Sequence, residues 1–353
     1  MDQEKEIFAE KPKEGEPWDV AIVGSGPAAL TAAIYTTRGA ASTLILGGEK
    51  WGGQLMLTTD VDNYPGFPEG IQGPELMEKM RKQAERFGAE FVEKFVEGVD
   101  FDKEPKELTA GGETYKAKTV IIATGADIRW LEVPGEEKLR GRGVSSCAPC
   151  DAPFYKDKKV IVVGGGDSAM EEALVLTKYA ESVTIVHRRD EFKASQAMQQ
   201  KVFDKQNEGK IRIFWDTEVA EMLGEEKLES VKLKTRVASE QAKKVKDESW
   251  ISNLKGEVEK EEGELIHWKM PIEGLFVAIG HIPATEVFKG EIELDKKGYV
   301  EVKDHTKTSR QNGVFVAGDV HDYTYRQAVT AAGFGCMAGM EVLGYLDKSS
   351  PNW

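Results

Sequence analysis

Residues 146–151 read SCAPCD, and residues 160–169, which follow them closely, read VIVVGGGDSA. The second run joins an apolar strand to the pattern G-x-G-x-x-A. In this pattern the glycines let the backbone approach a pyrophosphate, and the following helix offers it free N–H groups. We therefore expect a βαβ dinucleotide-binding unit to begin at Val160. The Cys-x-x-Cys pair before it is typical of a redox dithiol, because two close thiols can exchange with a partner disulfide.

The cysteine count argues against a metal site. A zinc site would need a second pair of ligands at short spacing, but the chain has one further cysteine, Cys336, and five scattered histidines. A structural disulfide is also disfavoured, because a two-residue spacer closes too small a loop to restrain the unfolded chain much. Cys336 lies among small apolar residues and is predicted to be a packed hydrophobic side chain. We expect no bound metal.

A similar glycine turn lies near the N-terminus. Residues 18–23, WDVAIV, are predicted to form a buried parallel strand, and Gly24-Ser-Gly26-Pro27-Ala28-Ala precedes a small-residue helix. The next strand, 42–46, ends in Gly47-Gly48 with no carboxylate for a ribose, which leaves the adenosine contacts open. Further buried strands ending in glycine are expected at 119–123, 274–279 and 314–317. The sequence thus predicts an α/β fold with two Rossmann-like dinucleotide-binding domains, each three-layered around a parallel central sheet.

The residues after strand 183–186 indicate which nicotinamide cofactor is used. The strand ends in His187-Arg188-Arg189, and Lys193 follows. Arg188 lies 24 residues after Gly164, near the position where an NAD site carries its ribose-binding acid. An isolated arginine pair is more often a solvated charge run. At this position, however, two guanidinium groups favour a 2′-phosphate, and therefore NADPH.

Length and charge limit the function classes. A chain of 353 residues suggests two domains. With 47 basic and 61 acidic residues, its net charge of −14 argues against a nucleic-acid partner. Residues 1–16 form a charged tail without the apolar run of a signal peptide, and no segment approaches 18 consecutive apolar residues. Three cysteines suit a reducing compartment, so we expect a cytoplasmic protein that does not enter a membrane.

The apolar pattern fades between residues 235 and 264. Lysines are followed there by an acid-rich run from Glu257 to Glu264. We expect a surface hairpin extension or a mobile loop, and a docking surface is an alternative.

Together these motifs resemble the low-molecular-weight thioredoxin reductases, the class II members of the FAD- and NADPH-dependent pyridine nucleotide-disulfide oxidoreductases. The resemblance runs from about Trp18 to Leu346, except for residues 235–264. Besides the two glycine turns, its most specific parts are Cys147–Asp151, Gly52–Leu55, His187–Arg189, Ala317–Asp319 and Arg326–Ala328.

The resemblance implies an NADPH domain inserted into an FAD domain. The FAD domain would comprise residues 1–128 and 273–353, and the inserted domain residues 129–272 with the cysteine pair. The family positions for FAD match Gly24, Gly26, Pro27, Ala28, Gly53, Gln54, Leu55, Asn63, Ala123, Thr124, Gly125, Gly318, Asp319, Arg326, Gln327 and Ala328. Those for NADPH match Gly164, Gly166, Asp167, Ser168, His187, Arg188, Arg189 and Lys193.

The implied function is thioredoxin-disulfide reduction. NADPH would reduce FAD, FAD would reduce the Cys147–Cys150 disulfide, and the dithiol would reduce a thioredoxin-like protein, with a rotation of the NADPH domain between the half-reactions. The resemblance assigns Cys150 to the flavin side, Cys147 to attack on the partner and Asp151 to proton donation. It also implies a homodimer.

The sequence departs from the family pattern at two places. Lys193 replaces a third arginine, which keeps the charge but loses the bidentate fork. Pro153-Phe154 stands where family members carry two aromatic residues that grip thioredoxin.

Alternative functions remain at this point. A flavin-dependent dithiol oxidase would pass electrons to oxygen, but it needs no 2′-phosphate clamp. A non-catalytic redox or dinucleotide sensor would not need redox cysteines beside two intact glycine turns. A further alternative is a reductase of the same family that takes electrons from a donor other than NADPH, such as a ferredoxin.

Overall fold

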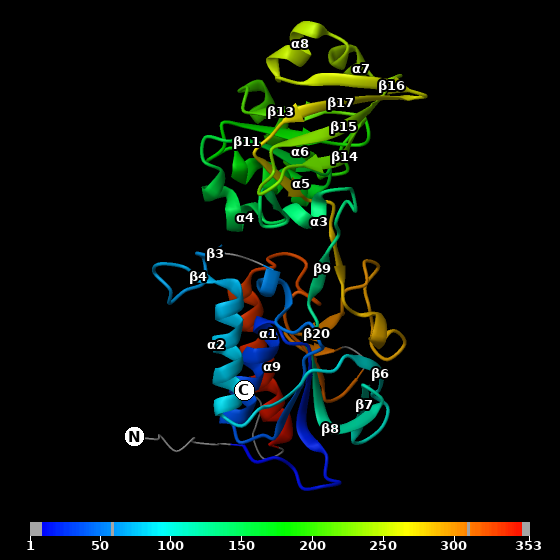
Figure 1. The fold of residues 1–353 in the computed structure, drawn as a ribbon. Helices are drawn as coiled ribbons and strands as arrows, with labels where there is room; N and C mark the ends of the chain where they lie inside the picture. Colours follow the sequence, from blue (N-terminus) through cyan, green and yellow to red (C-terminus); the bar gives the residue numbers. More distant parts are fainter. Residues whose placement is uncertain (1–8, 58–59, 309–310, 348–353) are drawn as a thin grey trace. The chain divides into compact units, whose positions relative to one another are not determined.

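A computed structural model describes residues 9–57, 60–308 and 311–347 (Figure 1). The chain forms two compact units, one of residues 1–127 and 282–353 and the other of residues 128–281. The second unit is therefore inserted into the first as one continuous segment. The two connecting strands, β9 (Ala126–Ile128) and β19 (His281–Pro283), pair with each other.

The first unit is built on a sheet whose central strands run parallel in the order β22-β8-β1-β2-β5. These strands are β1 (Trp18–Val23), β2 (Thr43–Leu46), β5 (Glu90–Val92), β8 (Glu113–Ile122) and β22 (Val314–Val316). The antiparallel strands β20 (Val302–Asp304) and β21 (Lys307–Thr308) extend one edge, and the hairpin β6 (Val96–Asp100) and β7 (Lys106–Ala110) joins β8.

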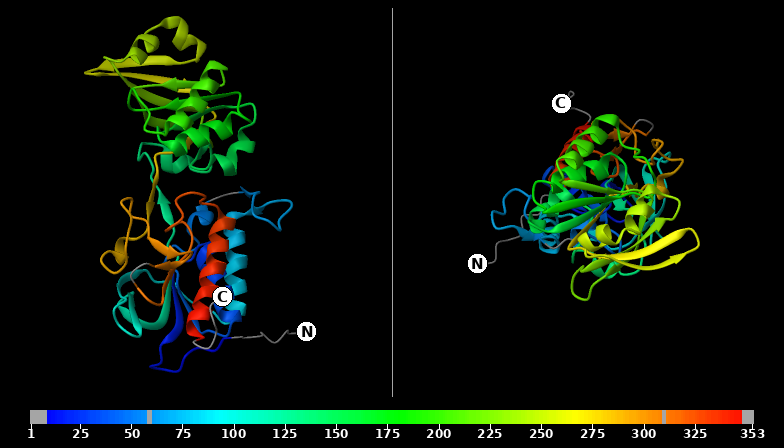
Figure 2. Two further views of the ribbon diagram at one scale, coloured as in Figure 1. Left: turned by 180° about the vertical axis from the view of Figure 1, so that it is seen from behind. Right: turned by 90° about the horizontal axis from the view of Figure 1, so that it is seen from above.

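Alternation of side chains divides the core of this unit into two layers. Val20 and Ile22 of β1 pack with the helices α1 (Pro27–Arg38), α2 (Gly73–Arg86) and α9 (Ala328–Leu346). Ala21 and Val23 point to the opposite face, where residues of β6, β7 and the segment 287–300 cover the sheet. The helices lie together on one side of the sheet in both side views (Figures 1 and 2).

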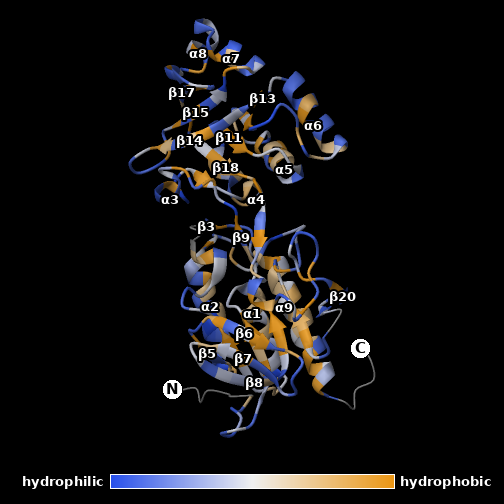
Figure 3. Cartoon of the chain, turned by 90° about the vertical axis from the view of Figure 1, so that its right-hand side faces the viewer, coloured by the Kyte–Doolittle hydropathy of each residue, from blue (hydrophilic) through white to orange (hydrophobic). Residues whose placement is uncertain are grey.

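Glycines let α9 lie close against α1. A side chain at Gly335 would start 2.1 Å from the Ala28 carbonyl oxygen, and one at Gly339 would start 2.9 Å from the Tyr35 Cβ. By length and composition alone, α9 is the one helix of the described residues that could cross a membrane. The core helix of a soluble protein meets the same criterion. The side of α9 with Gly335 and Gly339 packs on α1, but only 33% of its apolar window is buried (Figure 3 colours the helix by hydropathy).

The inserted unit is also three-layered. Its parallel sheet has the order β10-β18-β11-β12-β13, formed by β10 (Val144–Ser145), β18 (Gly274–Val277), β11 (Lys159–Val163), β12 (Ser182–Val186) and β13 (Ile211–Phe214). One face carries α4 (Ala148–Asp151), α5 (Asp167–Leu176) and α6 (Gln196–Asn207). The other carries an antiparallel sheet of β14 (Thr217–Leu223), β15 (Ser230–Arg236), β17 (Leu265–Pro271) and β16 (Glu257–Glu262).

Short elements complete the two units. They are η1 (Gly53–Leu57), β3 (Asp60–Val61), β4 (Ile71–Gln72), α3 (Glu136–Leu139), η2 (Ala152–Tyr155), α7 (Glu240–Val245), α8 (Glu248–Asn253) and η3 (Glu286–Phe288).

The structure corrects two expectations about the inserted unit. Its second boundary lies after His281 rather than after Ile272, because β18 pairs with both β10 and β11 and so belongs to its sheet. Of the two forms expected for residues 235–264, the surface hairpin is present, because the exposed strand β16 pairs antiparallel with β17, whereas the mobile loop is not. The segment forms α7, α8 and β16, and Val245 and Ile251 are buried in the same core as the sheet.

Candidate functional site

The first glycine turn leaves open space at the start of α1. Gly24 follows β1 with a φ of 120°, and a side chain there would start 2.2 Å from the Ala123 carbonyl oxygen, so only glycine fits. At Gly26 no atom lies within 4 Å of where a side chain would start. Pro27 occupies the first turn of α1, which costs the helix no hydrogen bond. Open space before a helix N-terminus suits a phosphate group.

Predicted residues from two other strands reach the same sheet edge. Ala123, Thr124 and Gly125 follow β8, and Gly318 and Asp319 follow β22; both strands run parallel to β1. Gly318 has a φ of 81° and approaches Ala28, whose Cβ would lie 2.9 Å from an added side chain. The structure therefore brings the three segments together at the carboxyl ends of parallel strands, where α/β folds bind ligands.

Asp319 has an unusual environment. Its Oδ1 atom is buried and has no hydrogen-bond partner among the described residues. Burial, and then repulsion from Asp322, raise the pKa of Asp319 to about 7, and Arg326 opposes this shift. A buried acceptor without a donor is costly in a folded protein. The position therefore fits a bound molecule that supplies hydroxyl donors, as the ribityl chain of FAD would.

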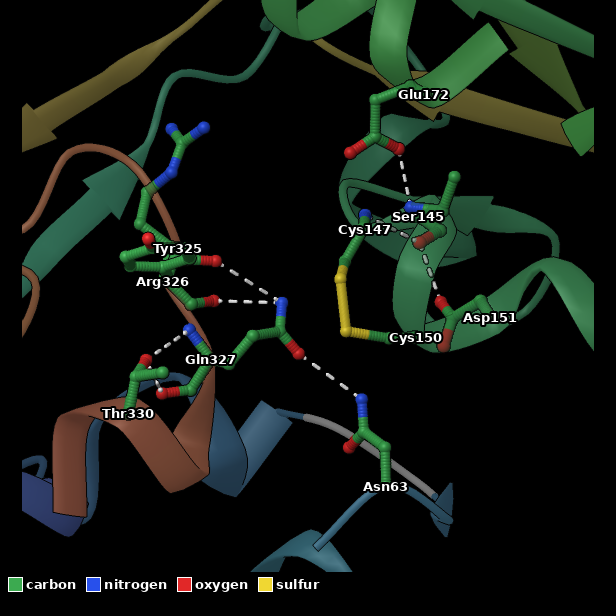
Figure 4. Close-up of a disulfide and its surroundings, with 11 residues drawn as sticks. Asn63, Ser145, Cys147, Cys150, Asp151, Glu172, Tyr325, Arg326, Gln327 and Thr330 are labelled. Carbon is green, nitrogen blue, oxygen red and sulfur yellow. Dashed lines mark hydrogen bonds between the residues drawn. A yellow bond between two sulfur atoms is a disulfide. The ribbon is translucent and has the colours of Figure 1, made fainter. Parts of the chain in front are cut away.

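A polar network joins predicted residues of the first unit around the start of α9. The Asn63 side-chain amide donates to the Gln327 Oε1 atom at 3.2 Å (Figure 4). Gln327 donates in turn to the carbonyl oxygens of Tyr325 (3.4 Å) and Arg326 (3.2 Å). It also forms a capping box with Thr330 that fixes the first turn of α9, where Ala328 is the first residue.

The remaining predicted residues of the first unit lie on η1. The Gln54 amide donates to Asp127 Oδ1 at 3.3 Å, and Leu55 packs at the rim of the helical core. A side chain at Gly53 would start 3.7 Å from the Gly26 Cα, so η1 lies beside the glycine turn.

The second glycine turn, in the inserted unit, repeats the geometry of the first. A side chain at Gly164, whose φ is 154°, would start 2.4 Å from the Ala278 carbonyl oxygen, whereas Gly166 again faces open space. Asp167 begins α5, followed by Ser168, and its Oδ1 atom accepts hydrogen bonds from the Ser195 N–H (2.9 Å) and hydroxyl (2.7 Å). These bonds hold the segment that follows Lys193 against the turn.

His187 shapes this turn from within. A side chain at Gly165 would start 2.2 Å from the His187 ring, which also contacts Phe192 and Trp215. Burial lowers the pKa of His187, which favours the neutral ring. The histidine thus packs behind the loop rather than on its surface.

The three cations of the loop are placed differently from His187. Arg188 and Lys193 are exposed and Arg189 is half-buried. Within the described part of the chain, none of their side chains makes an ion pair. The loop therefore presents three positive charges that suit a phosphate group.

The cysteine pair forms a disulfide at the start of α4. Cys147 and Cys150 have Cα atoms 5.3 Å apart. Cys147 caps the helix, and its carbonyl oxygen accepts from the N–H groups of Cys150 (3.2 Å) and Asp151 (3.0 Å). No group of three or more potential metal-ligating side chains is found among the residues that the structure describes.

Asp151 is held by a serine that the sequence analysis did not single out. The Ser145 hydroxyl donates to Asp151 Oδ2 at 2.6 Å and accepts from the Cys147 N–H at 3.1 Å (Figure 4). Burial raises the pKa of Asp151, and the bond from Ser145 partly offsets this rise. A carboxyl group whose pKa is raised by burial, next to a redox cysteine, suits proton donation. The sequence signal was a serine two residues before the first cysteine, but serines are too common in loops to stand out.

Cys336 differs from its prediction. It is only half-buried on α9, with its Sγ atom 3.9 Å from Met340 Sδ, so it is not a fully packed core residue.

Comparisons with known proteins agree on one family. Residues 18–335 match the family of pyridine nucleotide-disulphide oxidoreductases. A thioredoxin reductase of Streptomyces coelicolor is 47% identical over 341 residues, which covers 94% of this chain and 97% of the relative. The thioredoxin reductase of Mycolicibacterium smegmatis is 46% identical over 328 residues, covering 93% and 96%.

The chain belongs to the thioredoxin reductase family. Solved thioredoxin reductases share its fold. That of Streptococcus pyogenes aligns with a TM-score of 0.80 at 38% identity, over 94% of this chain and 98% of the other. That of Giardia duodenalis aligns with a TM-score of 0.80 at 40% identity, over 94% and 99%. The expected two-domain Rossmann-type fold and membership of this disulfide oxidoreductase family are thereby confirmed.

Proposed function

We propose that this chain uses NADPH to reduce the disulfide of a thioredoxin-like protein, with FAD as the resident cofactor. The observation that carries the proposal is the Cys147–Cys150 disulfide, which stands with a hydrogen-bonded acid, Asp151, in the same unit as a dinucleotide turn. A protein that only binds dinucleotides would need neither this disulfide nor the acid beside it.

The residues of the first unit would hold FAD. The open turn at Gly26 would receive the pyrophosphate, and the buried Asp319 Oδ1 would accept from a ribityl hydroxyl. We add Glu49 as a candidate for the adenosine ribose. It is exposed and follows Gly47-Gly48 at the end of β2, where the sequence analysis found no acid.

The matching turn of the inserted unit would hold NADPH, with Arg188, Arg189 and Lys193 around its 2′-phosphate. When bound, the two cofactors would supply the hydride and pass its electron pair to the protein disulfide.

The two cysteines would divide the remaining work. Cys147 would attack the partner disulfide, forming a mixed disulfide, and Cys150 would then attack Cys147 and release the partner as a dithiol. Asp151 would donate a proton to the departing thiolate. These steps oxidise the Cys147–Cys150 dithiol by the same two electrons that the partner gains.

The inserted unit would rotate between the two half-reactions. Cys150 and the nicotinamide must each come within about 3–3.5 Å of the flavin, and two groups cannot occupy one flavin face together. The short connections β9 and β19 would act as the hinge.

Two exposed apolar regions would contact the partner protein and a second copy of the chain. Phe154 keeps 45% of its surface exposed three residues after Asp151 and would contact the incoming thioredoxin-like protein. Tyr35 and Met340 expose apolar surface on α1 and α9 and would form part of a homodimer interface. We expect the protein in the cytoplasm.

Steady-state oxidation of NADPH in the presence of oxidised thioredoxin tests the proposal. We expect turnover that continues without oxygen and is abolished in Cys147→Ser and Cys150→Ser. Formation of peroxide from a dithiol, without any need for NADPH, would instead identify a dithiol oxidase.

A further inference from the structure

Glu172 contacts the redox helix from a neighbouring element. It lies one and a half turns into α5, and its Oε2 atom accepts a hydrogen bond from the Ala148 N–H, the first N–H of α4. Figure 4 shows the carboxylate pointing at the backbone that follows Cys147. Both residues belong to the inserted unit, and Glu172 is half-buried there.

This contact changes what surrounds the Cys147 sulfur. A thiolate at the start of a helix is commonly stabilised by backbone N–H groups of the first turn. Here the Ala148 N–H donates to Glu172, and Pro149 has no N–H. The N–H groups of Cys150 and Asp151 both donate to the Cys147 carbonyl oxygen. Each N–H of this turn thus has an oxygen acceptor already.

We propose that Glu172 is a positioning residue for Cys147, which anchors the redox helix and disfavours the thiolate once the disulfide is opened. Two effects act in the same direction. The Glu172 carboxylate occupies the Ala148 N–H, which is the N–H closest in sequence after Cys147. Its negative charge also lies at the residue next to Cys147, where a second negative charge develops when the thiolate forms. This role of Glu172 rests on the proposed function, in which Cys147 is the attacking thiol.

The consequence for thiol exchange follows from basicity. A thiol with a higher pKa is a stronger nucleophile as a thiolate, and it is a poorer leaving group. Cys147 would therefore attack a partner disulfide effectively. The mixed disulfide would also revert less readily, because Cys147 would be a poorer leaving group. Glu172 would in this way favour forward transfer to the partner.

The test is a thiol titration that needs neither NADPH nor thioredoxin. In a background of Cys150→Ser and Cys336→Ala, Cys147 is the only thiol, and the pH dependence of its alkylation by iodoacetamide reports its pKa. Glu172→Gln keeps an oxygen acceptor for the Ala148 N–H but removes the charge. We expect its alkylation midpoint to fall by roughly one pH unit, the lower end of shifts caused by a neighbouring charge.

Matched variants separate this effect from others. Glu171→Gln changes an exposed carboxylate one residue away on α5 and should leave the midpoint in place. Asp151 and Tyr155, the other titratable side chains of α4 and η2, are present in every variant, and Tyr155 stays neutral because burial raises its pKa to about 12. Glu172→Ala also frees the N–H and should lower the midpoint further; thermal unfolding shows whether each variant is folded.

An unchanged midpoint in Glu172→Gln would overturn the proposal, as would an equal shift in Glu171→Gln. Failure of the proposed function would be seen separately, as absence of thioredoxin-dependent NADPH oxidation by the unmodified protein.

Discussion

Burial of Asp151, partly offset by the hydrogen bond from Ser145, should set the pH dependence of thioredoxin reduction. Burial raises the pKa of Asp151, so the carboxyl remains a proton donor at higher pH than an ordinary aspartate, and the rate should decline as pH rises through that pKa. In Ser145→Ala the hydrogen bond that lowers the pKa of Asp151 is lost, and this decline in rate should move to higher pH.

Asp151→Asn cannot donate as an acid, so reoxidation of the dithiol by thioredoxin should slow by about 10²–10⁴-fold.

Rapid mixing of the reduced enzyme with thioredoxin at several pH values measures these rates. Reduction of the enzyme by NADPH serves as the internal control, because Asp151 has no role in it. Equal slowing of both steps in Asp151→Asn would show that the residue is structural.

Asp319 should make the cofactor-free protein less stable as the pH rises. Its carboxyl has a pKa of about 7 in the folded chain and an ordinary value of 3.8, so the folded state binds the proton more tightly. This contribution to the free energy of unfolding is complete below about pH 4 and is lost as pH rises through 7. It amounts to about 4 kcal/mol at most. Urea unfolding of the apoprotein between pH 4.5 and 8 should show the decline, and Asp319→Asn should flatten it. A decline of equal size in Asp319→Asn would assign it to other groups.

Individual residues were predictable from the sequence where a motif fixed their position. The glycines at 24, 26, 164 and 166 and the cysteine pair follow from spacing alone. Ser145 and Glu172 did not, because their roles depend on contacts across six and 24 residues of chain that no short pattern records. Asp319 was predicted, but its unsatisfied oxygen and raised pKa depend on burial that only the folded unit creates.

At the scale of elements, the loop after β12 should decide between NADPH and NADH. Arg188→Ala with Arg189→Ala removes two guanidinium groups from the 2′-phosphate, and each charge-assisted contact is worth about 1.5–3 kcal/mol. The KM for NADPH should therefore rise by roughly ten- to a hundredfold per arginine, while that for NADH stays nearly constant. Arg212→Ala, which changes an exposed arginine on the neighbouring strand β13, is the matched control. An unchanged ratio of the two KM values in the double variant would rule out the clamp.

Elements were predicted best where apolar periodicity was strong. The buried parallel strands β1, β11, β12 and β22 appear within a residue or two of their expected bounds. Within residues 235–264 the surface hairpin was expected, but α7 and α8 were not, because their apolar side chains are few and widely spaced. Val245, Ile251 and Leu254 nevertheless bury against the sheet, and the charged residues between them face solvent. Short helices that pack through two or three side chains carry too weak a periodic signal to be recognised.

At the scale of the whole molecule, the insertion of one unit into the other was implied by family resemblance and not by the residues themselves. The strand β18 shows why its second boundary was misplaced. Each unit contains a buried strand ending in glycine late in the chain, β18 in the inserted unit and β22 in the first. Strand sequences alone do not reveal which sheet they join, because the central strands of both sheets run parallel and are buried and apolar.

In the proposed mechanism, electrons leave this protein through Cys147 to the disulfide of a thioredoxin. The most direct test is to mix the Cys150→Ser variant with a thioredoxin and map any covalent adduct by peptide mass analysis. We expect a mixed disulfide that joins Cys147 to the thioredoxin, is reversed by dithiothreitol, and is absent when Cys147→Ser is used instead. An adduct through Cys150 in the Cys147→Ser variant, with none through Cys147, would contradict it.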